Sequence, residues 1–215
     1  TDTAPCIACP ANSETATVAT QAASDCLCSV AFEGVIEGMA TGSGSCAACP
    51  SGKFKSTVGT GSCEACPANS HTWASVGVLS DTNDAAADCL CSVGFMGIIS
   101  GTSKAYGQCK ECPAGTFKAD VGTSDCVACP PQSHSPVNSG AATACLCDVG
   151  YMGTIVGSAS ASGSCQGCSM GKYKAVTGAD ACSDCPDNSN SPTASDAAYY
   201  CKCLQGFEGI ISGVS

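Results

Sequence analysis

The spacing of the cysteines constrains the fold of this chain more than any other feature of its sequence. All 22 cysteines fall into seven Cys-x-x-Cys pairs and four Cys-x-Cys pairs. The first type begins at positions 6, 46, 63, 109, 126, 165 and 182, and the second type at positions 26, 89, 145 and 201. Such self-similarity indicates a tandem repeat. The repeating unit is two Cys-x-x-Cys pairs followed by one Cys-x-Cys pair.

The segments between the cysteines repeat as well. Pro-x-Gly-x-aromatic-Lys or a close relative follows the first pair of a unit, Pro-x-Asn-Ser or a close relative follows the second, and Gly-aromatic-x-Gly-x-Ile-x-Gly follows Cys-x-Cys. Ala31 stands in the leading glycine place of the first copy. The sequence therefore predicts four segments: the C-terminal part of a preceding repeat over 1–45, complete repeats over 46–108 and 109–164, and a repeat over 165–215 that is incomplete at its C-terminal end.

Composition indicates what must hold these repeats together. The hydrophobic fraction of 44% includes alanine and all 22 cysteines, and a chain so poor in large apolar side chains cannot offset its conformational entropy by burial alone. This density of cysteine is typical of a disulfide scaffold. Segments between turn signals are short and lack helical periodicity. We predict a small disulfide-rich fold, a tandem array of cysteine-rich repeats with short β-hairpins and loops and negligible helix, forming an elongated rod.

Loop lengths limit how the cysteines can pair. The simplest scheme joins each cysteine to the next one across a loop, which gives separations of 14 and 18 in every copy of two loop types and of 17, 23, 16 and 16 in the third. Variation confined to one loop is expected where that loop lies at the surface and is closed by its own bridge. Cys6 and Cys203 are left over. The cysteines expected in disulfides are Cys9, Cys26, Cys28, Cys46, Cys49, Cys63, Cys66, Cys89, Cys91, Cys109, Cys112, Cys126, Cys129, Cys145, Cys147, Cys165, Cys168, Cys182, Cys185 and Cys201.

The motifs together resemble a known repeat. Cys-x-x-Cys-Pro-x-Gly-x-Phe-Lys, then Cys-x-x-Cys-Pro-x-Asn-Ser, then Cys-x-Cys-x-x-Gly-Phe is similar to the ephrin-receptor-like cysteine-rich repeat. The chain also resembles tumour necrosis factor receptor modules and, over the last third of the motif, EGF-like domains. The resemblance implies an extracellular, disulfide-bonded, elongated module used for spacing, adhesion or binding. EGF domains cross their first two bridges, so the likeness leaves crossed pairing open.

Charge and motif content argue against several functions. The net charge is −10 and all eight basic residues are lysine, so the basic footprint of a nucleic-acid-binding protein is missing. No apolar run is long enough to insert this segment directly into a membrane. Cys46, Cys49, Cys63 and Cys66 have nearly zinc-ribbon spacing, but zinc would leave the Cys-x-Cys pairs without a role. We expect no bound metal, no cofactor and no enzyme activity.

Other polar residues could act as metal ligands or catalytic groups, but they are better explained as residues of solvated turns. His71 and His134 occupy equivalent places, but Glu14 and Asn190 take that place in the other units. Asp81, Asp84 and Asp88, with Asn83, offer oxygen atoms that suit calcium, yet the cluster is not repeated and lacks the calcium-loop pattern. We interpret both sets as surface loop residues.

Three aromatic residues and five serines are candidates for contacts with other molecules. Trp73, Tyr199 and Tyr200 either pack over a neighbouring disulfide or anchor another chain. No Asn-x-Ser/Thr sequon occurs, whereas serine-rich turns favour O-linked glycans. The candidate acceptors are Ser135, Ser158, Ser160, Ser162 and Ser191.

Regularity without a singular site predicts a structural role. We expect a non-enzymatic extracellular or cell-surface protein, in which this segment of a longer chain builds or decorates a filament or surface coat. Its partners would be further copies of itself, in a head-to-tail homo-oligomer or filament, or other extracellular proteins. The alternative is the ligand-binding or adhesive stalk of a cell-surface receptor.

Overall fold

The computed structural model describes residues 7–17, 25–37, 43–72 and 83–211. In these residues the strands are two to six residues long and pair as two-stranded antiparallel sheets, with isolated parallel bridges between Phe117 and Ser139 and between Tyr173 and Ser195. The chain forms two compact units. The first comprises Thr1–Ser92 and Gly97–Cys109, and the second comprises Val93–Met96 and Lys110–Ser215.

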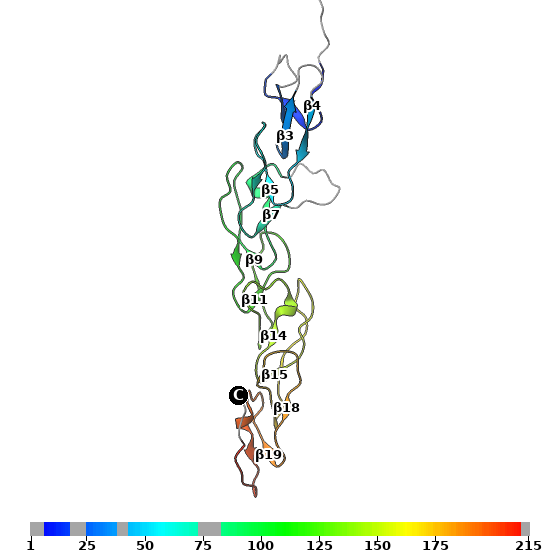
Figure 1. Cartoon of the computed structure of the whole chain (residues 1–215). Helices are drawn as coiled ribbons and strands as arrows, with labels where there is room; N and C mark the ends of the chain where they lie inside the picture. Colours follow the sequence, from blue (N-terminus) through cyan, green and yellow to red (C-terminus); the bar gives the residue numbers. More distant parts are fainter. Residues whose placement is uncertain (1–6, 18–24, 38–42, 73–82, 212–215) are drawn as a thin grey trace, which may run out of the picture. The chain divides into compact units, whose positions relative to one another are not determined.

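The hairpins of the first unit follow one another along the chain (Figure 1). They are β1 (Ser13–Thr15) with β2 (Cys26–Cys28), β3 (Phe32–Glu37) with β4 (Ser43–Ala48), β5 (Lys53–Phe54) with β6 (Glu64–Ala65), and β7 (Ser70–Thr72) with β8 (Cys89–Cys91). A 3₁₀ helix, η2 (Ala86–Asp88), precedes β8.

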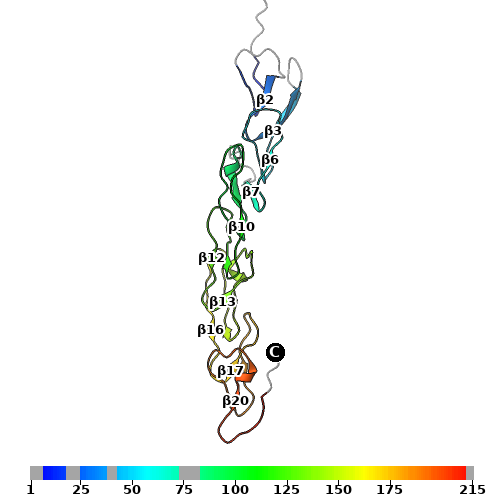
Figure 2. The same ribbon diagram turned by 90° about the vertical axis from the view of Figure 1, so that its left-hand side faces the viewer.

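The second unit repeats the same three hairpin types twice (Figure 2). They are β9 (Phe95–Met96) with β10 (Lys110–Glu111), β11 (Thr116–Phe117) with β12 (Val127–Ala128), β13 (Ser133–His134) with β14 (Leu146–Cys147), β15 (Tyr151–Met152) with β16 (Gln166–Gly167), β17 (Lys172–Tyr173) with β18 (Ser183–Asp184), and β19 (Ser189–Asn190) with β20 (Lys202–Cys203). The 3₁₀ helices are η3 (Ala142–Ala144) and η4 (Ala198–Tyr200). Helix in the described residues is thus confined to single 3₁₀ turns, as the sequence predicts.

Ten disulfides join successive cysteines across loops in the part of the chain that the structure describes. The pairs are Cys9–Cys26, Cys28–Cys46, Cys49–Cys63, Cys66–Cys89, Cys91–Cys109, Cys112–Cys126, Cys129–Cys145, Cys147–Cys165, Cys168–Cys182 and Cys185–Cys201. Cys203 has no bridge within the described residues. The predicted fold class, a disulfide-rich tandem array of short hairpins, is confirmed.

Small apolar clusters form around the bridges instead of one core. In the first unit Ile36 packs with Cys26, Cys28 and Cys46. In the second unit Phe117 packs with Ala142, Cys145 and Ile155, and Phe117 is fully buried. In the repeats over 46–108 and 109–164 the isoleucine of Gly-aromatic-x-Gly-x-Ile and the aromatic residue of the Lys-bearing motif are buried, whereas the equivalent Tyr173 and Ile211 are half-buried.

Candidate functional site

The lysine of the Pro-x-Gly-x-aromatic-Lys motif is buried in all three copies. Lys55, Lys118 and Lys174 are only 3–4% exposed. The Lys55 Nζ donates hydrogen bonds to the carbonyl oxygens of Cys28 at 3.2 Å, Ser29 at 3.4 Å and Gly59 at 2.9 Å. A buried ammonium group is tolerated only when its protons find acceptors, and here backbone carbonyls provide them.

The other two lysines also donate to backbone carbonyl oxygens. Lys174 Nζ donates to the carbonyl oxygens of Tyr151 at 2.9 Å and Gly178 at 2.7 Å. Lys118 Nζ donates to Gly122 O at 3.0 Å. Lys55 and Lys174 thus each bind one carbonyl four residues ahead in their own loop and one that lies 27 or 23 residues back. This contact ties the loop to the repeat before it.

Burial alters the acidity of these ammonium groups. Desolvation lowers the pKa of Lys55, Lys118 and Lys174 from the ordinary 10.5 because it disfavours the charged form. Nearby carboxylates oppose the shift in part, Glu33 at Lys55 and Asp120 at Lys118. Since three of the eight lysines are buried, the solvent-facing charge is more acidic than the composition alone indicates.

Backbone hydrogen bonds reinforce the same junction. The Gly94 amide donates to Lys118 O at 2.8 Å, and the Cys112 amide donates to Gly94 O at 2.8 Å. The equivalent pairs of bonds are Ala31 to Lys55 with Cys49 to Ala31, and Gly150 to Lys174 with Cys168 to Gly150. The leading glycine place therefore binds the lysine and the first Cys-x-x-Cys of the next repeat.

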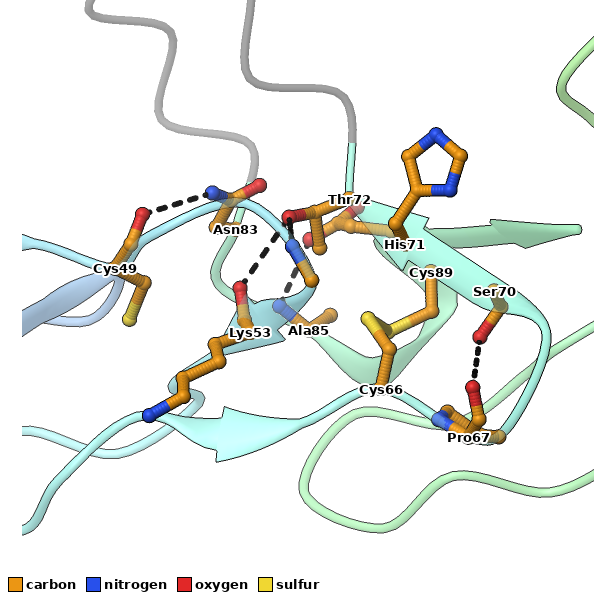
Figure 3. The surroundings of a disulfide bond; sticks show 12 residues. Cys49, Lys53, Cys66, Pro67, Ser70, His71, Thr72, Asn83, Ala85 and Cys89 are labelled. Carbon is orange, nitrogen blue, oxygen red and sulfur yellow. Dashed lines mark hydrogen bonds between the residues drawn. A yellow bond between two sulfur atoms is a disulfide. The ribbon is translucent and has the colours of Figure 1, made fainter. Parts of the chain in front are cut away.

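A buried hydroxyl joins the first and second loops of each repeat. Around the Cys66–Cys89 disulfide, Thr72 Oγ1 accepts a hydrogen bond from the Gly52 amide at 3.0 Å and lies 3.4 Å from Lys53 O (Figure 3). Ser135 Oγ donates to Thr116 O at 2.8 Å, and Ser191 Oγ donates to Lys172 O at 3.0 Å. All three hydroxyl-bearing residues are at most 3% exposed.

This burial corrects the expectation that Ser135 and Ser191 are O-glycan acceptors. Their hydroxyls are enclosed and bonded to the backbone, so the folded chain does not present them to a glycosyltransferase. Ser158, Ser160 and Ser162 are exposed between β15 and β16, and they remain proposed acceptors.

The candidate contact residues have different surroundings. Trp73 lies outside the described residues. Tyr199 and Tyr200 are 51% and 37% exposed, with ring centroids 4.2 Å apart. A hydrogen bond with Tyr200 raises the pKa of Tyr199 to about 12. The two rings form a small exposed aromatic surface at η4.

Histidine side chains make local contacts. His71 Nδ1 lies 3.0 Å from Ser92 Oγ, and His134 Nδ1 pairs with Asp148 Oδ1. In both cases the partner is the residue that follows the second cysteine of Cys-x-Cys, just after the opposite strand ends. Each histidine therefore braces its own hairpin.

The acidic and cysteine-rich candidates form no metal centre in the described residues. Asp88 Oδ2 accepts a hydrogen bond from the Ala85 amide at 2.9 Å at the start of η2, and burial raises the pKa of Asp88. Asp81 lies outside the described residues. The cysteines with zinc-ribbon spacing are in disulfides instead. In the described ranges no three metal-ligating side chains cluster, and none of the helices there is long and apolar enough to span a membrane.

Sequence reasoning identified the repeated lysine but missed its burial. The available signal was its position: in a chain with only eight lysines, three stand three residues after the motif glycine. A charged residue repeated so strictly beside an aromatic residue indicates a defined set of partners.

Parts of the chain are similar to known cysteine-rich proteins. Residues 38–77 and 100–147 match the family described as tyrosine-protein kinase ephrin type A/B receptor-like. Cysteine repeat modular protein A of Toxoplasma gondii is 28% identical over 217 residues, which cover 93% of this chain and 7% of that protein. Ephrin type-B receptor 2 of Coturnix japonica is 41% identical over 63 residues, covering 29% of this chain and 6% of the receptor.

A shorter match is closer in identity. Ephrin type-B receptor 6 of Mus musculus is 54% identical over 43 residues, covering 20% of this chain and 4% of the receptor. The chain thus spans less than a tenth of the length of each of these relatives. The ten disulfides and the repeated hairpins make this chain a cysteine-rich repeat protein, and over the matched residues it is ephrin-receptor-like.

Proposed function

We propose that the chain is a non-enzymatic, structural segment of an extracellular protein that builds or decorates a filament or surface coat. The observation that carries the proposal is the repetition of the junction: a buried lysine bonded to backbone carbonyls, the same pair of backbone hydrogen bonds and a buried hydroxyl recur in successive repeats. A chain selected for one binding or catalytic site would differ at that site from its other copies. Disulfides at this density persist in oxidising compartments, which supports an extracellular location.

The proposed repeat boundaries follow the cysteine pattern. Residues 46–108 and 109–164 form complete repeats, with partial repeats over 1–45 and 165–215. Stacked repeats that contact their neighbours give quasi-one-dimensional arrays. We propose homotypic assembly or binding to other extracellular proteins, with O-linked glycans on the exposed serines between β15 and β16.

Immunogold labelling tests this proposal. Antibodies raised against the folded chain are applied to intact, non-permeabilised source cells, with permeabilised cells as the control. We expect gold particles in regular arrays on surface filaments or coat material. Labelling that requires permeabilisation would overturn the proposed location and function.

A receptor stalk is the second candidate, favoured by the 54% identity to an ephrin type-B receptor over 43 residues. It predicts dispersed surface label that detergent extracts together with membrane proteins. Coat or filament material would keep the label after detergent extraction. The same cells therefore distinguish the two functions.

A further inference from the structure

The order of the disulfides defines the covalent path that a pulling force would follow. Between Cys9 and Cys201 the chain has 192 residue steps, of which the ten bridges bypass 168 and leave 24. Tension passes through the shortest covalent connection, so the bypassed loops carry none of it. Only the disulfides and the short linkers between them are loaded.

Every linker between successive bridges is strand. The two-residue linkers are β6, β10, β12, β16, β18 and the end of β4, and the single-residue linkers lie in β2, β8 and β14. A strand rises about 3.2–3.4 Å per residue, close to the limit of about 3.3–3.6 Å for a fully extended chain. The linkers therefore have almost no backbone slack to release under load.

We propose that this chain acts as a tension-bearing tether whose length is limited by its disulfide ladder. The bridges have Cα–Cα distances of 5.4–5.7 Å, so the segment from Cys9 to Cys201 cannot exceed about 140 Å while oxidised. The reduced segment could reach about 690 Å. The proposal deepens the structural role proposed above and rests on it.

The bypassed loops keep their contacts under load. The buried hydroxyl of Ser135 and its acceptor Thr116 both lie inside bridged loops. Force that travels along the bridges does not pull these groups apart directly. The surface carried by the loops, including the exposed serines between β15 and β16, should therefore persist while the chain is stretched.

Single-molecule force spectroscopy on the full chain between marker domains tests the tether. Without reductant, we expect the marker domains to unfold while the chain adds no length step of its own. With reductant, each cleaved bridge should release its loop in one step, about 45 Å for a 14-residue separation and about 77 Å for the 23-residue separation. The ten steps should total about 550 Å.

Variants that replace both cysteines of one bridge test which bridges lie on the covalent path of the force. Replacing both Cys66 and Cys89 by Ser should add about 77 Å to the oxidised chain, and replacing both Cys112 and Cys126 should add about 45 Å. Lys118→Met is the matched control, because it weakens folded contacts without altering any bridge, and it should add no length.

Two outcomes would overturn the tether, and both are separable from failure of the proposed function. One is an oxidised wild-type chain whose segment from Cys9 to Cys201 extends well beyond about 140 Å, and the other is a Lys118→Met variant that lengthens as much as the cysteine variants. Either result leaves surface labelling unchanged. Label found only inside cells would overturn the extracellular role while the length limit could still be measured.

Discussion

The ammonium nitrogen of Lys55 lies 3.2 Å from the carbonyl oxygen of Cys28, a residue 27 positions earlier in the chain. The same carbonyl accepts a hydrogen bond from the Gly59 amide at 2.9 Å. One buried cation thus joins the Cys-x-Cys of one repeat to the first disulfide loop of the next. The repeat boundary is stabilised by a polar contact where a larger protein would use an apolar core.

Lys55→Met should destabilise this junction. Methionine fills much of the same space but cannot donate, which leaves carbonyl oxygens of Cys28, Ser29 and Gly59 without that donor. Unsatisfied buried acceptors cost about 1–3 kcal/mol. We expect a loss of that size in the free energy of unfolding with bridges intact, measured by urea titration, and faster amide exchange at Gly59. The exposed Lys110→Met is the control and should change neither measurement.

Alkaline pH should increase the contribution of Lys55 to the free energy of unfolding. Because burial lowers the folded-state pKa of Lys55, the unfolded state binds more protons than the folded state between that lowered pKa and 10.5. Stability from this residue is therefore constant below the window and rises with pH through it. The difference in unfolding free energy between wild type and Lys55→Met should grow over that range, with Cys203 alkylated to prevent disulfide exchange. A difference that shrinks with pH would contradict the assignment.

The sequence predicted the architecture because cysteine spacing and turn residues are local signals. Pro-x-Asn-Ser prescribes a turn, and Asn69 indeed has φ of +62° while Ser70 bonds back to Pro67. Burial was harder to predict. Ser135 and Ser158 are both serines in serine-containing segments, and only tertiary contacts bury the first and expose the second. The buried lysines were missed for the same reason, since Lys55 and Lys174 each find an acceptor in a preceding repeat.

Gly150→Ala should be far more damaging than Gly206→Ala. Both glycines lead the same motif with positive φ, +78° and +88°. A Cβ on Gly150 would lie 2.5 Å from the Ala194 carbonyl oxygen, whereas a Cβ on Gly206 meets nothing within 4 Å. The Gly206 variant should cost only the left-handed backbone penalty of about 1–2 kcal/mol. Differential scanning calorimetry should show a larger loss for Gly150→Ala, because backbone must move; equal losses would refute the steric argument.

O-linked glycans on the native fold should be attached to exposed serines and not to buried ones. Intact-mass and fragment-ion analysis of protein purified from its source should place modification on Ser158, Ser160 or Ser162 and none on Ser135 or Ser191. Ser135→Ala should instead destabilise the chain by about 1 kcal/mol, because its hydroxyl donates to Thr116 O. Modification found on Ser135 would contradict the buried hydroxyl contact.

Non-reducing peptide mapping should recover each cysteine joined to the next one across its loop. Cys66 joined to Cys89 and Cys91 joined to Cys109 are diagnostic, because a crossed EGF-like arrangement would join other members of these loops. Replacing both Cys112 and Cys126 by Ser should cost about 3 kcal/mol through the released 14-residue loop. The matched control, Ser158→Ala, leaves every bridge in place and should cost less than about 0.5 kcal/mol.

Metal analysis on the same sample separates a disulfide ladder from a zinc array. Disulfide sulfurs have no thiolate to offer a metal, so cysteines bridged as in the structure should resist alkylation and carry no stoichiometric zinc. Freely alkylated Cys49 and Cys63 together with bound zinc would refute the bridge between them. That result would also remove the covalent length limit. A loop held by a metal should open when a chelator removes the metal, whereas a loop held by a disulfide should open with reductant and not with chelator.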